Sequence, residues 1–145
     1  MVFRKLVSPS EFFNILPQDW RDDLLPQWQD LEGTSDVFVV KYRADVISGG
    51  IVFHQMLPQL SAVEFQASML FKNVPYIGYI YTQPEYRSLG AASFWFHALF
   101  NRRKNQSYWL SIEDLRLSFF YQKFGFSLYE FKEQSIDEYI MIKTK

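Results

Sequence analysis

The sequence predicts a single α/β (α+β) domain with a mixed sheet. Two β-rich stretches joined by a tight turn indicate an antiparallel hairpin, and a later strand–helix–strand run indicates a parallel pair. Hydrophobic residues make up 48% of the 145 positions and aromatic residues 19%, so the chain has enough apolar side chains for one core. We therefore expect residues 1–145 to form one domain.

The composition excludes several classes of function. With 15 basic and 16 acidic residues, the net charge of -1 lacks the basic excess of a nucleic-acid-binding surface. The absence of cysteine excludes disulfides, zinc-thiolate sites and thiol nucleophiles. No apolar run approaches the roughly 18 residues of a membrane span, and the first residues are too interrupted for a signal peptide. We expect a cytoplasmic protein that binds no nucleic acid, membrane or metal.

Two helices are expected near the start of the chain. Ser8 and Glu11 fit a capping box, and the helix that they begin should end before Pro17. A second helical stretch, residues 19–31, should be interrupted at Pro26 because proline lacks the N–H that a helix interior needs.

An antiparallel hairpin follows these helices. Residues 36–43 and 46–55 are rich in β-formers and are separated by two turn residues. Gly49 and Gly50 inside the second strand suggest a bulge or the close approach of another segment. Residues 56–75 are compatible with either a helix or a strand.

A strand–helix–strand unit occupies the middle of the chain. Residues 76–82 are expected to form a strand, a loop runs to Gly90, and residues 91–104 have the apolar face of a helix, with Trp95 in the core. Residues 107–112 form the next strand, which should lie parallel to the first because such crossovers join parallel strands.

A short helix and two strands complete the predicted order. Asp114 can cap a helix whose apolar pattern begins at Leu117, and Gly125 suits the left-handed position at its end. The last two strands are expected at about residues 127–131 and 138–143, from their content of β-formers.

The loop that ends at Gly90 can be interpreted as an anion site. The N–H groups at a helix start are unpaired and carry a partial positive charge, which suits a phosphate. Gly90, Ala91 and Ala92 leave these groups uncovered, and Arg87 lies just ahead of them. The spacing matches neither the P-loop nor the dinucleotide fingerprint. On these residues alone, a tight turn with alanines packed against the sheet is the simpler explanation.

Two motifs resemble those of the GNAT N-acetyltransferases. Residues 87–92, RSLGAA, resemble the acetyl-CoA-binding motif, in which Gln or Arg stands three residues before a glycine and Gly or Ala two residues after it. Residues 119–126, FFYQKFGF, resemble the family's FYxKxGF signature and follow in the family's order. The likeness extends from Asp36 to Lys143. It implies a mostly antiparallel sheet with a splayed parallel central strand pair, flanked by helices.

The resemblance implies acetyl-CoA as co-substrate and assigns the residues that would bind it. The strand before the loop would hydrogen-bond the pantetheine arm through the backbone of Ile80, Tyr81 and Thr82. The loop amides would bind the pyrophosphate, a role that falls here on Arg87, Ser88, Leu89, Gly90, Ala91, Ala92 and Ser93. Asp114 stands where the family often has asparagine, so its carboxylate suits a nearby phosphate less well.

The resemblance also implies catalytic roles. Tyr121 matches the tyrosine that protonates the leaving thiolate in many members, and a phenol with a reference pKa of about 10 is protonated at neutral pH. The helical pattern alone favours a core tyrosine instead. Glu113 is our candidate general base; Asp114, Glu64 and a water chain to solvent are alternatives. His54 and His97 titrate in a useful range but are weaker candidates from their positions.

These expectations lead to one main function and two alternatives. The main one is direct acetyl transfer to a primary amine, on a small molecule or a peptide, in a ternary complex without a covalent enzyme intermediate. The alternatives are a non-catalytic coenzyme A sensor or interaction module, and transfer of a longer acyl group. The acceptor should be selected by the first 35 residues, residues 56–75 and the last hairpin. Homodimers are common in the family.

Overall fold

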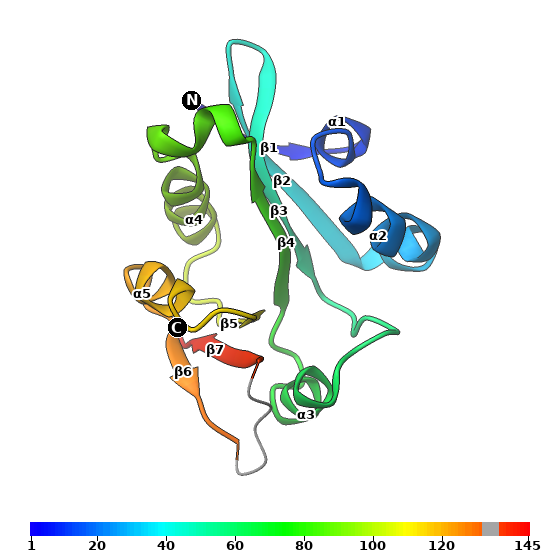
Figure 1. The fold of residues 1–145 in the computed structure, drawn as a ribbon, viewed down its shortest axis with the longest axis vertical. Helices are drawn as coiled ribbons and strands as arrows, with labels where there is room; N and C mark the ends of the chain where they lie inside the picture. The colour runs from blue at the N-terminus through cyan, green and yellow to red at the C-terminus, as the bar shows by residue number, and fades with distance from the viewer. Residues whose placement is uncertain (132–136) are drawn as a thin grey trace.

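Seven strands form one sheet in the computed structural model, which describes residues 1–131 and 137–145 (Figure 1). The strand order is β1-β2-β3-β4-β5-β7-β6, and every neighbouring pair is antiparallel except β4 and β5, which are parallel. The strands are β1 Val2–Leu6, β2 Ser35–Tyr42, β3 Asp45–Phe53, β4 Tyr76–Thr82, β5 Tyr108–Ile112, β6 Ser127–Tyr129 and β7 Tyr139–Lys143. The predicted mixed, mostly antiparallel sheet with one parallel pair is confirmed.

The parallel pair separates almost at once. β4 and β5 are joined at one position, Tyr76 opposite Trp109, where the Trp109 N–H also donates to the Pro75 carbonyl at 3.1 Å. Beyond Tyr76, β4 has no ladder partner on the side that faces β5, so its backbone N–H and C=O groups there are open to a ligand.

Helices cover both faces of the sheet (Figure 1). The longer ones, α4 and α2, lie on opposite faces: α4 with α5 on one, α2 with α1 and α3 on the other. Their bounds are α1 Ser10–Phe13, α2 Gln18–Leu31, α3 Ala62–Leu70, α4 Ala91–Arg102 and α5 Leu117–Gln122, with short 3-10 helices η1 Glu32–Thr34 and η2 Pro84–Leu89.

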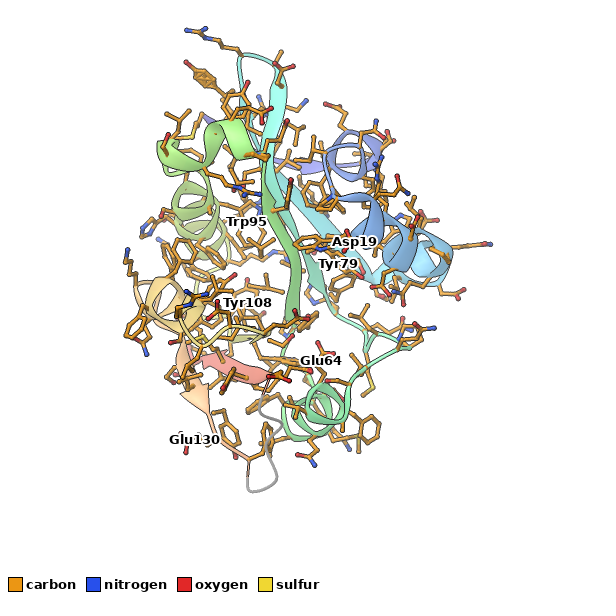
Figure 2. All side chains as sticks on the ribbon, viewed as in Figure 1. Asp19, Glu64, Tyr79, Trp95, Tyr108 and Glu130 are labelled. Atoms are coloured by element: carbon orange, nitrogen blue, oxygen red, sulfur yellow. The ribbon has the colours of Figure 1, made fainter. Side chains whose placement is uncertain are left out.

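Strand alternation creates a separate apolar core on each face. Phe38 packs with the fully buried Trp95 and Phe96 of α4, as expected for that helix, and the Trp95 indole N–H donates to the Phe38 carbonyl at 2.9 Å. The neighbouring β2 residues Val37 and Val39 instead pack against α1 and α2. Trp95 therefore lies on one side of β4, and Tyr79 and Asp19 lie on the other (Figure 2).

The structure differs from the sequence expectation at the start of the chain. Residues 2–6 form an edge strand that we did not predict, paired antiparallel with β2. The proposed capping box is wrong: Pro9 occupies the N-cap of α1, no side chain caps it, and the helix is one turn long. Pro26 does not interrupt α2. The helix tolerates it because Leu24 and Leu31 bury their side chains and outweigh one missing backbone bond.

Residues 56–75, which fitted either a helix or a strand in the sequence, contain helix α3. The start of this helix is well defined. Ser61 Oγ accepts from the Glu64 N–H at 3.1 Å, and Glu64 Oε1 accepts from the Ser61 N–H at 3.2 Å, which is a complete capping box. The sequence Ser-Ala-Val-Glu carried this signal. The box fixes the position of the Glu64 side chain as well as the start of the helix.

The glycine pair in β3 reflects a close approach. A Cβ on Gly49 would lie 2.6 Å from the Phe12 ring, and one on Gly50 would lie 2.4 Å from the Ile80 side chain. The adjoining bulge is in the other strand. Gly49 pairs with Tyr81 and Ile51 with Gly78, so β4 carries one extra residue between these pairs.

The region after β5 begins its helix later than expected. Helix α5 starts at Leu117 without a side-chain cap, so Asp114 does not cap it. The Asp114 carboxylate instead accepts a hydrogen bond from the Arg116 backbone N–H at 2.9 Å. Gly125 has the left-handed φ of 94° that we expected. The last two strands, β6 and β7, are each shorter at one end than the strands that we predicted. Residues 132–136 between them lie outside the described part of the chain.

Candidate active site

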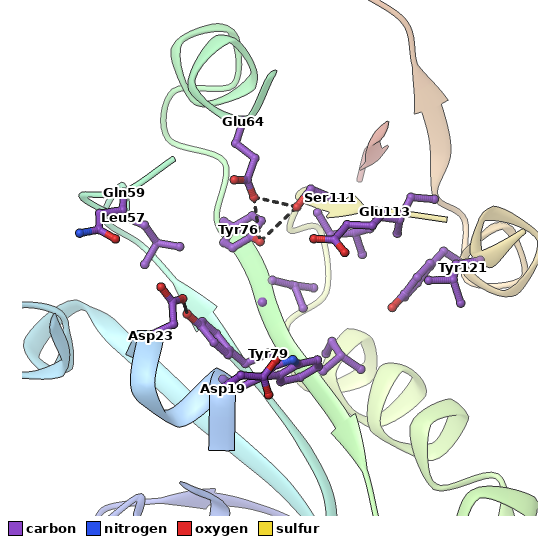
Figure 3. A pocket seen from close by; sticks show the side chains of 17 residues that line it. Asp19, Asp23, Leu57, Gln59, Glu64, Tyr76, Tyr79, Ser111, Glu113 and Tyr121 are labelled. Carbon is purple, nitrogen blue, oxygen red and sulfur yellow. Dashed lines mark hydrogen bonds between the residues drawn. The ribbon is translucent and has the colours of Figure 1, made fainter. Parts of the chain in front are cut away.

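A cleft of about 600 Å³ opens where β4 and β5 separate (Figure 3). Four elements surround it: α2 on one side, α3 at the end, β5 and α5 on the other side, with β4 along its floor. Polar lining residues come from all of these elements and include Asp19, Asp23, Glu64, Tyr76, Tyr79, Ser111, Glu113 and Tyr121. A cavity of this size suits a small ligand.

The bulge in β4 shapes the middle of the cleft. Tyr79 has a φ of 56°, in the left-handed region that bulky residues rarely adopt. Its ring packs edge-on against Trp20 at 6.0 Å, and its hydroxyl donates to Asp23 Oδ2 at 2.5 Å. Burial and the Asp23 carboxylate both raise the pKa of Tyr79, so its hydroxyl keeps its proton.

A second cavity, of about 440 Å³, adjoins the first and shares Trp20 and Ile80 with it. It lies between the end of β4 and the start of α4, and it has the features of an anion cradle. Gly90 has a φ of 74°, and a Cβ placed on it would meet nothing within 4 Å. Residues 90–93 line this cavity, so the unpaired N–H groups at the start of α4 lie at its wall, which suits an anion such as a pyrophosphate.

Arg87 is held beside this cradle by the end of β4. Its Nε donates to the Thr82 carbonyl at 3.0 Å, and its guanidinium lies 5.5 Å above the centre of the Tyr81 ring. Ser48 of β3 fixes the same strand end, because its hydroxyl lies 2.7 Å from the Thr82 hydroxyl and donates to the Tyr81 carbonyl at 3.1 Å. A cation is thus fixed next to the helix start.

Tyr121 enters the first cavity from α5. Its ring packs edge-on against Phe96 at 5.7 Å and Phe126 at 6.2 Å, while its hydroxyl is directed into the cleft (Figure 3). Burial raises the pKa of Tyr121 to about 12. The side chain is therefore both part of the apolar core and the source of a protonated hydroxyl group at the cleft.

Glu64 and Glu113 face the cleft from the side opposite α2 (Figure 3). Glu64 Oε2 accepts from the Ser111 hydroxyl at 2.8 Å and from the Tyr76 hydroxyl at 3.4 Å, so both of its oxygens have partners. The Glu113 side chain is exposed and accepts no hydrogen bond from any residue in the described ranges. Of the two, Glu113 is the one whose carboxylate oxygens have no hydrogen-bond partner among the described residues.

Most of the predicted cofactor residues come together in the second cavity. Its lining contains Ile80, Tyr81, Thr82, Arg87, Gly90, Ala91, Ala92 and Ser93, together with Trp20 and Phe120, which we did not predict. Ser88 and Leu89 belong to η2 and do not line it. Asp114 lines neither cavity, and Arg116 holds both of its carboxylate oxygens, at 2.7–3.1 Å.

The remaining candidates lie elsewhere. His54 contacts Asp36 at 3.2 Å, and His97 packs on Phe124; neither lines the two cavities. The acidic residues of α2 were missed. Asp19 and Asp23 stand four residues apart and so share one face of a helix, which was visible in the sequence, but the direction of that face depends on how α2 packs.

The chain belongs to the acetyltransferase (GNAT) family, whose model matches residues 4–126. No curated protein matches its sequence. Several solved structures share its fold. An aminoglycoside 6'-acetyltransferase type Ii matches with a TM-score of 0.69 at 12% identity, covering 99% of this chain and 97% of its own. An aminoglycoside 6'-N-acetyltransferase complexed with coenzyme A matches with the same score and coverage at 9% identity.

A GNAT-family acetyltransferase from Staphylococcus aureus has a TM-score of 0.63 at 9% identity, covering 99% of this chain and 98% of its own. At these identities the similarity shows the fold, and the family match indicates an acetyltransferase that uses an acyl-CoA co-substrate. Within residues 1–131 and 137–145, no helix is long and apolar enough to cross a membrane, and no cluster of His, Asp and Glu could hold a metal ion.

Proposed function

We propose that this chain is an acetyl-CoA-dependent N-acetyltransferase that transfers the acetyl group directly to a primary amine in a ternary complex. One observation carries the proposal. The anion cradle at the start of α4 and the cleft that contains Tyr121 adjoin each other along one strand, β4. A cofactor bound in the cradle can therefore extend its reactive end toward Tyr121, and an amine can enter from the side of α2 and α3.

The residues of the cradle would bind the cofactor. Arg87 and the N–H groups from Gly90 to Ser93 would hold the pyrophosphate, and the open edge of β4 from Ile80 to Thr82 would hydrogen-bond the pantetheine arm as an added strand does. Asp114 has no part in this proposal because Arg116 holds its carboxylate.

Bound acetyl-CoA would supply the thioester, from which the amine nitrogen gains the acyl group as the C–N bond forms and the C–S bond breaks. Glu113 would accept the proton that the ammonium must lose before its nitrogen can attack. Tyr121 would donate its phenolic proton to the departing sulfur. The apolar surroundings that raise the pKa of Tyr121 would raise that of the thiol as well, so proton transfer stays feasible.

Release of free thiol from acetyl-CoA tests the proposal. The amines to be tested are amino acids, polyamines, aminoglycosides and peptide N-termini. With at least one of them, we expect acetyl-CoA to release its free thiol and the amine to gain the mass of an acetyl group. Coenzyme A binding would be measured separately by calorimetry. Binding without thiol release for any amine would contradict the enzyme and indicate a coenzyme A sensor. Absence of binding would contradict both functions.

A further inference from the structure

The two ends of the cleft carry opposite charge. The lining of the cradle includes Arg87 and the positive end of the α4 dipole, and it includes no carboxylate. The lining of the larger cavity includes four carboxylates and no lysine or arginine. The chain as a whole has a net charge of only -1, so the acidic lining is a local feature.

The four carboxylates reach the cavity from both sides. Asp19 and Asp23 lie one turn apart on the same face of α2, whereas Glu64 and Glu113 face them from α3 and from the end of β5 (Figure 3). None of the four forms a salt bridge with any residue of the described ranges. No lysine, arginine or histidine of the described ranges therefore neutralises their charge.

The negative charge of the cavity affects neighbouring groups. Burial raises the pKa of Glu138, and the charges of Glu64 and Glu113 raise it further. Burial also raises the pKa of Tyr76, with a further contribution from Glu64. These effects act from different elements and have the same sign, as a single region of negative potential requires.

The walls between the carboxylates suit an alkyl chain with charged ends. Leu57, Ile77 and Ile80 line the cavity beside the rings of Trp20 and Tyr79. Aliphatic side chains pack against methylene groups, and aromatic faces attract an ammonium group.

We propose that the acceptor is a di- or polyamine whose second ammonium group is bound by Asp19 and Asp23 while its reacting amine lies toward Tyr121. The proposal rests on the proposed function, because it assigns the acceptor of that reaction to the same cleft. It also assigns different roles to the carboxylates. The pair on α2 binds and orients the distal cation, and Glu113 accepts the proton of the reacting amine.

Matched acceptors that differ only in the far group test this proposal. Putrescine and hexamethylenediamine end in a second ammonium, butylamine and hexylamine in a methyl group, and γ-aminobutyrate in a carboxylate. Calorimetry with coenzyme A already bound should give dissociation constants at least about tenfold lower for the diamines than for the monoamines, and no binding of the amino acid. Salt should reduce the difference. Equal affinity for diamines and monoamines would overturn the proposal.

Variants of α2 locate the effect. Asp19→Asn and Asp23→Asn should each weaken diamine binding by about tenfold and leave monoamine binding unchanged, since only the charge is removed. Asparagine can still accept the hydrogen bond of Tyr79 at position 23. Asp22→Asn is the matched control: it makes the same change of charge on the same helix, outside the cavity lining. If Asp22→Asn had the same effect, long-range charge and not this site would be responsible, and the proposal would be wrong.

Thiol release with the same amines separates the two proposals. Selective diamine binding without thiol release contradicts the proposed enzyme and retains the cation site. Thiol release at equal kcat/KM for diamines and monoamines supports the enzyme and contradicts the cation site.

Discussion

The Tyr79 hydroxyl of β4 donates a hydrogen bond of 2.5 Å to Asp23 Oδ2 of α2, across 56 positions of sequence. The bond joins the strand that lines both cavities to the helix that bears the acidic face. Tyr79 also has the left-handed φ of 56°, so the rest of the structure must hold it in a conformation that costs energy. The contact therefore fixes the position of α2 relative to the floor of the cleft.

Tyr79→Phe should weaken that connection. The ring contacts with Trp20 and Phe53 stay, but a hydrogen bond to a carboxylate is lost. We expect the free energy of unfolding to fall by about 1 kcal/mol, measured by urea denaturation, because the pair is partly exposed. The KM of the acceptor should rise more than kcat falls. Tyr42→Phe, at the far hairpin, is the control; equal losses in both variants would contradict a specific role for this bond.

Tyr121→Phe should separate catalysis from cofactor binding. Removal of the hydroxyl leaves the packing against Phe96 and Phe126 intact, so the dissociation constant of coenzyme A should stay within about twofold. The value of kcat should fall by about 10²- to 10⁴-fold, the usual contribution of a general acid. Tyr129→Phe, on the half-exposed ring of β6, should change neither. Unchanged turnover in Tyr121→Phe would leave the hydroxyl with a packing role alone.

The raised pKa of Tyr121 predicts the alkaline side of the pH profile. A donor with a pKa of about 12 keeps its proton throughout the range in which an amine and a carboxylate titrate. The value of kcat should therefore rise with pH and then level off, with no fall below about pH 10. A fall with an apparent pKa near the ordinary tyrosine value, absent from Tyr121→Phe, would show that burial does not perturb this group.

Gly90→Ala tests the cradle. A Cβ at this position has open space around it but must adopt a φ of 74°, so we expect a loss of about 1 kcal/mol in unfolding free energy. It would also project beside the amides of the first turn of α4, and coenzyme A should bind about tenfold more weakly. Gly33→Ala adds the same methyl group in open space on η1 and should leave coenzyme A binding unchanged. Unaltered binding in Gly90→Ala would contradict the cradle.

Asp36 predicts a loss of stability in acid. Burial alone would raise the pKa of Asp36, but hydrogen bonds from Arg103 and Lys5 and the charge of Arg103 outweigh it and lower the pKa from 3.8 to about 2. A carboxyl whose pKa is lower in the folded than in the unfolded state stabilises the fold at pH values above the unfolded-state pKa. That stabilisation is lost as the pH falls from about 4 to about 2.

In Asp36→Asn the unfolding free energy at neutral pH should be lower by on the order of 1 kcal/mol, after allowance for solvent screening. The difference from wild type should disappear near pH 2, and Asp30→Asn, without an ion pair to any described residue, should show no such difference. A difference that persisted at pH 2 would indicate a packing defect and not the ion pair.

The sequence predicted those parts of the molecule that depend on local rules. The bare helix start at Gly90, the left-handed Gly125 and the buried Trp95 each follow from a few neighbouring residues, and the parallel strands follow from the order strand, helix, strand; the structure agrees with all of them. The capping box at Ser61 was equally local, but the surrounding apolar run fitted a strand as well as a helix.

The other half of the cleft depended on packing between distant segments. Asp19 and Asp23 lie in the cleft only because α2 buries Leu24 and Leu31 against the sheet. Val2–Leu6 is a short edge strand with two basic residues, so it shows little of the alternation that identifies a strand. The bulge at Tyr79 has no sequence signal, since tyrosine rarely adopts a left-handed backbone.

The single pairing of Tyr76 with Trp109 means that backbone hydrogen bonding does not run continuously across the sheet. The four strands β1–β4 and the three strands β5–β7 can open to solvent in separate steps, because a continuous hydrogen-bond ladder between β4 and β5, which would make their opening cooperative, is missing. A cofactor that hydrogen-bonds to the free edge of β4 would take the place of the missing backbone hydrogen bonds between β4 and β5. Amide hydrogen exchange in both groups of strands should then slow together when coenzyme A binds, including at positions that the cofactor does not contact.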